Sequence, residues 1–285
     1  MENSETDAEF ISDFPAKSVA GEVLACGRHQ WIPYLLPFLV FMLAGNLEPR
    51  APAIEPETTE HTQVPTEMPA AHQDTAGEAG FIPYRWYPLA YALRIVLTLV
   101  AIGIALPMYR AFPFRISTWS VACGVVGVIA WVGFCALGLE KPILSLLPES
   151  FFGLNGSRAA FNPFEQLGRS RVALVSFLGV RFLGLVLVVP LIEEFFLRGF
   201  VARFVEDSNW WKLPIGSSAT IVWVSVAVYA AASHPAEMIA AVVWFSLVTW
   251  LVVKTKNIWD AVAAHAVTNL LLGIYVVSTE SWELW

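Results

Sequence analysis

The sequence predicts an all-α integral membrane protein, a polytopic helical bundle of about seven transmembrane helices. Its composition is 56% hydrophobic and 14% charged, with a mean hydropathy of +0.60, which is typical of a membrane protein and not of a soluble domain. Apolar stretches of roughly the length that crosses a bilayer alternate with polar loops. The predicted spans cover residues 31–46, 86–107, 117–139, 172–205, 217–233, 237–253 and 257–277.

The N-terminal half is predicted to begin with a polar segment and to contain three spans. Residues 1–30 are acidic and lack both the basic start and the early apolar core of a secretory signal peptide. The first span is short, and Pro33 and Pro37 predict a bend in it. Residues 48–80 are rich in Pro, Thr and Glu, which predicts a disordered acidic loop. Residues 31–139 would thus be an N-terminal transmembrane region around this loop.

The C-terminal half is predicted to begin at the membrane surface and to continue as a helical core. Residues 140–169 contain short apolar clusters between polar residues, which predicts an amphipathic interfacial segment. Residues 170–278 hold the last four spans. The fifth span is predicted to end at His234-Pro235, where the proline stops the helix. Asn257 is expected to cap the seventh span.

The distribution of charge predicts orientation and partners. A cytoplasmic N-terminus places many basic residues on or toward the cytoplasmic side, as the positive-inside rule favours. We therefore expect a multi-pass protein of the cell membrane, surrounded by membrane lipids. The net charge of −7 argues against a nucleic-acid partner. The basic residues on that side are Lys17, Arg28, Arg110, Arg115, Arg198, Arg203, Lys212, Lys254 and Lys256.

Two adjacent acids follow an apolar run in the fourth span. A charge at the centre of a bilayer costs from about 3 to more than 10 kcal/mol, so such residues are kept only when paired, hydrated or used. Glu194 and Arg198 are i and i+4 on a helix and can pair. Glu193 lies about 100° round the helix from Glu194, so the same arginine cannot easily neutralise both. Glu193 is thereby left for another role.

Three more polar residues lie in the last spans. His234 ends the fifth span, and His265 and Asn269 project from one face of the seventh as an i, i+4 pair. Taken singly, each could merely hydrogen-bond a neighbouring helix. We expect Glu193, His234, His265 and Asn269 to converge on one cavity, because convergence offsets the cost of burying them. Together they supply a general base, a group that polarises water or binds metal, and oxyanion donors.

The pattern resembles the CPBP family of intramembrane proteases, which includes the type II CAAX prenyl proteases and the bacterial ABI group. The resemblance covers about residues 170–275. The family usually has an aromatic residue four positions before its histidine, whereas here position 230 is alanine and the nearest aromatic residue is Tyr229. The N-terminal architecture resembles that of bacterial members associated with exosortase systems. The motifs that carry the resemblance are Glu193-Glu194-x-x-x-Arg198, His234 and His265-x-x-x-Asn269.

This resemblance implies an intramembrane endopeptidase with a protease-like core in the C-terminal half. Its substrate would be a membrane-associated protein or peptide. Glu193 would deprotonate a water that His234 helps to hold. His265 and Asn269 would donate hydrogen bonds to the developing oxyanion. The supporting pair would be Glu194 and Arg198.

Two chemistries stay open at this point. Glu193, His234 and His265 could bind zinc with one open position, and the family is commonly labelled as metalloproteases. The helical H-E-x-x-H arrangement of many zinc proteases is absent, however. A water activated by Glu193 without a metal fits the same residues. The favoured mechanism therefore requires no cofactor, and zinc is the alternative.

Two other classes of protein fit parts of the pattern. A proton- or ion-coupled transporter uses buried acids and histidines as relays, but it predicts inverted repeats and paired broken helices. The sequence has one such break, at His234-Pro235. A non-catalytic membrane scaffold would keep the fold after the chemistry had decayed, yet all four catalytic-type residues are present. The sequence identifies no substrate and does not imply a prenylated one.

Overall fold

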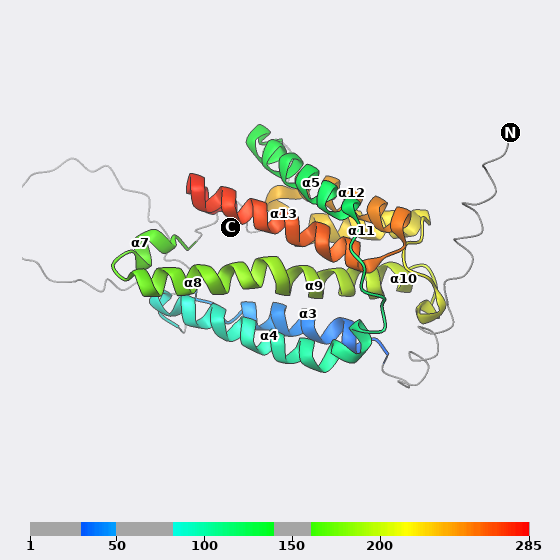
Figure 1. The fold of residues 1–285 in the computed structure, drawn as a ribbon, viewed down its shortest axis with the longest axis horizontal. Helices are drawn as coiled ribbons and strands as arrows, with labels where there is room; N and C mark the ends of the chain where they lie inside the picture. Colours follow the sequence, from blue (N-terminus) through cyan, green and yellow to red (C-terminus); the bar gives the residue numbers. More distant parts are fainter. Residues whose placement is uncertain (1–29, 50–81, 140–160, 285) are drawn as a thin grey trace, which may run out of the picture.

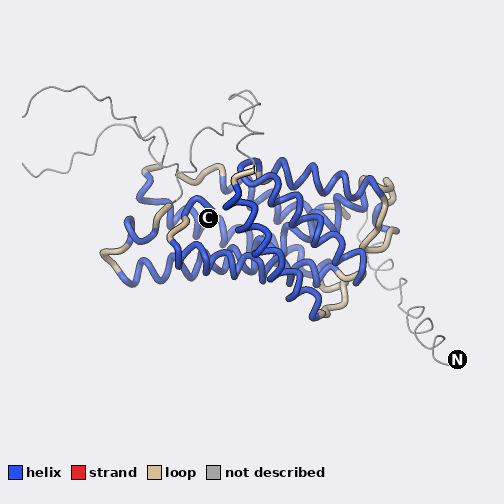
Figure 2. Tube along the Cα trace, turned by 90° about the horizontal axis from the view of Figure 1, so that it is seen from above, coloured by secondary structure: helices blue, strands red, loops and turns tan. Residues whose placement is uncertain are grey.

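The computed structural model describes residues 30–49, 82–139 and 161–284, and every regular element in these ranges is helical. This confirms the predicted all-α class (Figures 1 and 2). Within these described ranges, five helices are long and apolar enough to cross a membrane, judged by length and composition, and two shorter apolar helices accompany them. These helices correspond to the predicted spans and indicate a multi-pass membrane protein.

The central feature of the bundle is one continuous helix, α8–α10. Helices α3 and α4 pack together on one side of it, and α5 and α13 lie on the other side (Figure 1). Residues in the middle of the central helix therefore meet side chains from both groups. The apolar helices are α3 (Ile32–Gly45), α4 (Tyr87–Tyr109), α5 (Thr118–Leu137), α8–α10 (Arg171–Phe204), α11 (Thr220–Ser233), α12 (Met238–Thr255) and α13 (Ile258–Thr279). The short helices are η2 (Tyr84–Trp86), α7 (Pro163–Leu167), η6 (Trp210–Lys212), η7 (Pro235–Glu237) and η8 (Trp282–Leu284).

The central helix contains two π-helical stretches that the sequence did not predict. It consists of α8 (Arg171–Leu183), the π-helical η4 (Gly184–Val188), α9 (Val189–Glu194), the π-helical η5 (Phe195–Val201) and α10 (Ala202–Phe204). Its predicted continuity is confirmed. The π-helical stretches flank the segment that carries the two acids, and such stretches often occur at functional sites.

Pro190 explains the first π-helical stretch. Proline lacks an N–H, and within an α-helix its ring clashes with the carbonyl one turn earlier. The wider turn accommodates it, with Val189 N–H bonding the carbonyl of Gly184, five residues back. In the same register the carbonyl of Leu185 would receive the N–H of residue 190, which the proline does not have. The carbonyl of Leu185 therefore needs a hydrogen-bond donor from outside the helix.

The start of α13 is fixed by the residues predicted to cap it. Asn257 is the N-cap, and its side chain accepts a hydrogen bond from the backbone N–H of Trp259 at 3.1 Å. Its amide also donates to the carbonyl of Arg115. Asp260 accepts from the backbone N–H of Ser117 at 2.7 Å, so the first turn of α13 also holds the start of α5. The predicted cap at Asn257 is thus confirmed.

The first residue of the predicted acidic loop contacts a helix. Glu48 was expected to belong to the disordered loop, but it forms an ion pair with Arg94 of α4 at 3.0 Å. Arg94 also donates to the carbonyl of Phe41 in α3, so this contact ties the two helices together. Residues 50–80 of that loop lie outside the described residues, as do residues 1–29 and 140–160. The predicted domain boundaries stay predictions.

Candidate functional site

Glu194 is fully buried, and it joins three helices. Its predicted ion pair with Arg198 is confirmed, with Nη1 2.8 Å from Oε2. Arg198 also donates from Nη2 to the carbonyl of Phe245 in α12, at 3.1 Å. The other carboxylate oxygen, Oε1, accepts a hydrogen bond from the same Nη1 at 3.0 Å and lies 2.9 Å from Nδ1 of His265 in α13. The contact with His265 was not predicted, and it gives Glu194 the task of orienting the histidine.

Glu193 also contacts His265, but its second partner is a tyrosine and not Arg198. Its Oε1 accepts a hydrogen bond of 2.5 Å from the hydroxyl of Tyr229 in α11. Its Oε2 lies 3.7 Å from Nε2 of His265. Adjacent residues diverge by about 100° on a helix, which explains why Arg198 is directed to Glu194 instead. Glu193 is 8% exposed, so its carboxylate is held almost entirely by protein groups.

His265 lies between the two carboxylates, with one ring nitrogen directed at each. Its ring packs edge-on against Trp244, with centroids 4.6 Å apart. Trp244 is itself held by a hydrogen bond from its indole N–H to Thr268 at 3.0 Å. The ring orientation is therefore fixed on both its polar and its apolar sides. The two carboxylates of Glu193 and Glu194 thus share one imidazole, while one guanidinium pairs with Glu194.

His234 ends α11 and is oriented by the residue before it. Its Nδ1 lies 2.9 Å from the hydroxyl of Ser233, and that hydroxyl donates to the carbonyl of Tyr229 at 2.8 Å. Because the serine proton is used in that second bond, the histidine donates from Nδ1, which leaves Nε2 as an acceptor. The ring also packs against Trp131 and Phe245, with centroids 5.4 and 5.7 Å away.

Asn269 binds the carbonyl that Pro190 leaves without a backbone partner. Its Nδ2 donates to Leu185 at 2.8 Å. A side-chain amide has two N–H groups, so this bond leaves a second one for another acceptor. One bond thus explains both how the carbonyl is satisfied and how the amide is oriented.

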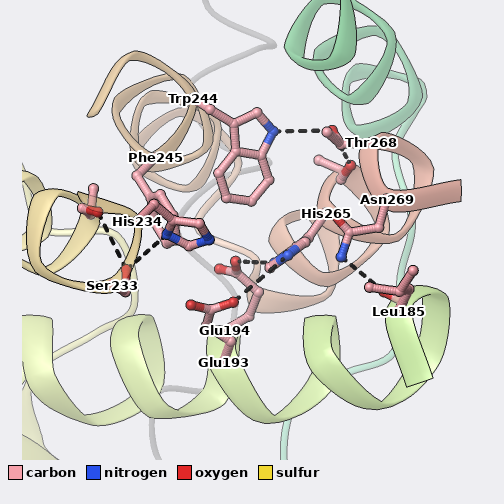
Figure 3. Close-up of polar contacts among 12 residues, drawn as sticks. Leu185, Glu193, Glu194, Ser233, His234, Trp244, Phe245, His265, Thr268 and Asn269 are labelled. Atoms are coloured by element: carbon pink, nitrogen blue, oxygen red, sulfur yellow. Dashed lines mark hydrogen bonds and ion pairs between the residues drawn. The ribbon is translucent and has the colours of Figure 1, made fainter. Parts of the chain in front are cut away.

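The candidate residues gather along one face of α9 (Figure 3). His234 lies on one flank and Asn269 on the other, with Glu193 and His265 between them. Direct contacts join Glu193 and Glu194 to His265, whereas the two flanking residues are anchored by their own neighbours. The arrangement can pair a buried base with hydrogen-bond donors on either side. The common cavity expected there stays a prediction.

The predicted zinc ligands do not form a three-ligand site. Among the residues that the structure describes, no three His, Cys, Asp or Glu side chains are grouped so as to hold a metal ion. Glu193 and His265 approach each other, but the second nitrogen of His265 faces Glu194 and His234 is not grouped with them. A catalytic zinc site has three protein ligands. Glu193, His234 and His265, as the structure places them, therefore do not fit a zinc ion.

Sequence reasoning missed two parts of this network. The first is Tyr229. The sequence marks it as the aromatic residue five positions before His234, but this position does not indicate its hydrogen bond to Glu193. The second is Trp244 with Thr268, which carried no signal because a tryptophan and a threonine in apolar helices are ordinary. Both reach the site from helices other than α9.

Comparison with known proteins bears on the same part of the chain. Neither a curated protein nor a solved structure matches the sequence. Residues 175–271 match the model of the family described as Type II CAAX prenyl endopeptidase Rce1-like. That stretch includes Glu193, His234, His265 and Asn269, while α3, α4 and α5 lie outside it. The similarity to this family therefore lies in the C-terminal half of the chain.

Proposed function

We propose that the chain is an intramembrane endopeptidase that hydrolyses a peptide bond of a membrane-associated protein or peptide. The observation that carries the proposal is the contact of Glu193 with His265, buried among apolar helices with Oε2 and Nε2 3.7 Å apart. A buried carboxylate outside the reach of the neighbouring arginine is costly unless it has work to do. The endopeptidase family match over the same residues supports this assignment.

Glu193 is the general base in this proposal. Its Oε2 takes one proton from a water molecule, and the water oxygen attacks the carbonyl carbon of the substrate peptide bond. The tetrahedral intermediate carries its negative charge on the former carbonyl oxygen. The proton then passes from Glu193 to the amide nitrogen, the C–N bond breaks, and an acid and an amine leave. A positioned base contributes about 10²–10⁴-fold to such a rate.

His234 holds the attacking water. Ser233 keeps Nδ1 as a donor, so Nε2 accepts a hydrogen bond from the water and orients its oxygen lone pair. Pro235 supports this role, because it ends helix α11 and leaves the imidazole of His234 at the junction between α11 and η7. His234 thus acts on the water and Glu193 on its proton.

His265 and Asn269 stabilise the oxyanion. With Nδ1 directed at Glu194, His265 donates from Nε2 when the ring carries both protons. That state also balances the charges of the two carboxylates and Arg198. Asn269 donates its second N–H, because its first is bound to Leu185. Loss of one such donor typically costs about 10²–10³-fold in rate.

The apolar helices support a membrane setting for the reaction. The enzyme would act as a multi-pass protein of the cell membrane with its N-terminus in the cytoplasm. The substrate would reach the site from the bilayer, so a membrane-anchored protein or peptide fits it better than a soluble one. Association with exosortase systems belongs to the same proposal, and prenylation of the substrate is not part of it.

The test compares membrane-protein termini in cells that express wild type, Glu193→Gln or Glu206→Gln. Glutamine keeps the size of the side chain but cannot take the proton. Glu206 is an exposed acid just beyond α10, so Glu206→Gln controls for loss of a carboxylate. We expect new termini with wild type and Glu206→Gln, and none with Glu193→Gln. Cleavage of the same substrate in liposomes containing the purified variants would follow.

The outcomes separate the alternative classes. Full cleavage by Glu193→Gln overturns the assignment of the base. A scaffold would retain its cellular function in Glu193→Gln, and a transporter would lose flux with no change in any terminus. A strong chelator added to the liposomes distinguishes the chemistries, because a zinc enzyme loses activity and regains it when metal is returned.

A further inference from the structure

Tyr229 reaches the candidate base from a different helix. Its hydroxyl donates to Oε1 of Glu193 at 2.5 Å, a length typical of a hydrogen bond from O–H to a charged oxygen. The other oxygen, Oε2, is the one directed at His265. The two carboxylate oxygens of Glu193 are therefore not equivalent, because one is engaged by the phenol and the other faces the catalytic-type histidine.

We infer that Tyr229 is a positioning residue for Glu193. Its hydroxyl holds Oε1 and fixes the plane of the carboxylate, so Oε2 is the oxygen that takes the proton from water. The inference rests on the proposed function and adds an atom-level division of labour to it. A general base must lie within hydrogen-bond reach of the proton it removes, so a carboxylate free to rotate would lose part of its rate.

An aromatic cluster keeps the hydroxyl of Tyr229 in place. Its ring packs near Phe38 of α3, Phe196 of η5 and Phe245 of α12, with centroids 6.3, 5.9 and 5.5 Å away. Phe38 and Phe196 also stack on each other at 4.1 Å. Three helices therefore fix the ring of Tyr229, and each of its three ring contacts has a centroid distance that aromatic pairs favour. Phe38 lies outside the family match, so the N-terminal region takes part in holding the base.

A merely structural role makes a different prediction. A buried tyrosine needs an acceptor for its hydroxyl, and any carboxylate would serve. In that case loss of the hydroxyl lowers stability and leaves catalysis intact. A positioning role requires the opposite pattern, in which kcat falls while substrate binding and stability change little.

The test is Tyr229→Phe, which keeps the ring and its packing and removes only the hydroxyl. We expect kcat to fall about 10- to 100-fold, the rate equivalent of a hydrogen bond to a charged group, with KM within about twofold. The control is Tyr109→Phe, which removes a hydroxyl that donates to a backbone carbonyl, that of Pro33 at 3.2 Å, and not to a carboxylate. The control should keep its kcat. An unchanged kcat in Tyr229→Phe, or an equal loss in Tyr109→Phe, overturns the inference.

An infrared measurement makes this inference separable from the proposed function. The difference spectrum between wild type and Glu193→Gln isolates the carboxyl band of Glu193, and that band should shift in Tyr229→Phe but not in Tyr109→Phe. If the band shifts in Tyr229→Phe but the wild type cleaves nothing, the proposed function is refuted. The hydrogen bond between Tyr229 and Glu193 is still supported in that case. An unshifted band refutes the inference even when the wild type is active. If Tyr229→Phe does not fold, wild type made with fluorinated tyrosine, a stronger donor, must shift the same band.

Discussion

The pair of Glu194 and Arg198 has a structural consequence that can be measured. Arg198→Ala strands a fully buried carboxylate and frees the carbonyl of Phe245, whereas Glu193→Ala leaves only a tyrosine hydroxyl and one histidine nitrogen without a partner. Breaking a buried ion pair from one side typically costs about 3–5 kcal/mol, and an orphaned neutral group about 1–3. Arg198→Ala should therefore melt at a clearly lower temperature in detergent than Glu193→Ala. Equal melting temperatures and folded yields would contradict this.

Residue contacts were predictable where they lie within one helix. The pairing of Glu194 with Arg198 follows from the i, i+4 spacing alone. The contact of Glu194 with His265 spans 71 positions and that of Glu193 with Tyr229 spans 36, so each depends on how separate helices pack. The candidate residues could therefore be identified from the sequence, but most of the residues that they contact could not.

The element scale offers a test through the proline of α9. Pro190→Ala supplies the missing N–H, which should bond the carbonyl of Leu185 and displace the amide of Asn269. Removing a proline from a helix interior also favours the helix by up to about 3 kcal/mol. We expect a protein at least as stable as wild type with activity about 10- to 100-fold lower, the scale of loss for a misplaced catalytic group.

Two variants complete the Pro190→Ala experiment. Pro107→Ala removes a proline from inside another apolar helix, α4, and should keep full activity. Asn269→Ala should lose at least as much activity as Pro190→Ala, about 10²–10³-fold, because it removes the donor outright. If Pro190→Ala is as active as wild type, the carbonyl of Leu185 does not determine how Asn269 is oriented.

Apolar length and polar breaks made the helices themselves predictable. The predicted spans end within a few residues of the observed ones, and the cap at Asn257 was identified from its residue type. The π-helical stretches were not predictable, because a helix can accommodate a proline in several ways, including a kink. Here the carbonyl of Leu185 is satisfied by Asn269, which lies 84 positions further along the chain. A local sequence pattern around Pro190 does not include that residue.

At the scale of the whole molecule, basic residues gather at one end of the bundle. Contacts there tie the start of α13 to the segment before α5, and the end of α12 to the segment before α11. That end carries Arg110 and Arg115 after α4, Lys212 after α10, and Lys254 and Lys256 at the end of α12. Glu280 and Glu283 follow the far end of α13. Three described arginines lie at the opposite end, namely Arg85 before α4 and Arg169 and Arg171 at the start of α8. The larger number of basic residues at the first end favours the prediction that it faces the cytoplasm.

Orientation can be tested with single cysteines in a variant whose native cysteines are replaced by alanine. Ser208→Cys lies in the exposed loop after α10, at the basic end, and Glu283→Cys lies in an exposed position after α13. A membrane-impermeant maleimide should label Glu283→Cys in intact cells and Ser208→Cys only after permeabilisation, because the two positions follow opposite ends of the bundle. Both should react fully in detergent, which controls for accessibility. Labelling of Ser208→Cys from outside, with Glu283→Cys protected, would show that the topology is the reverse of the proposed one, with the basic end of the bundle outside the cell.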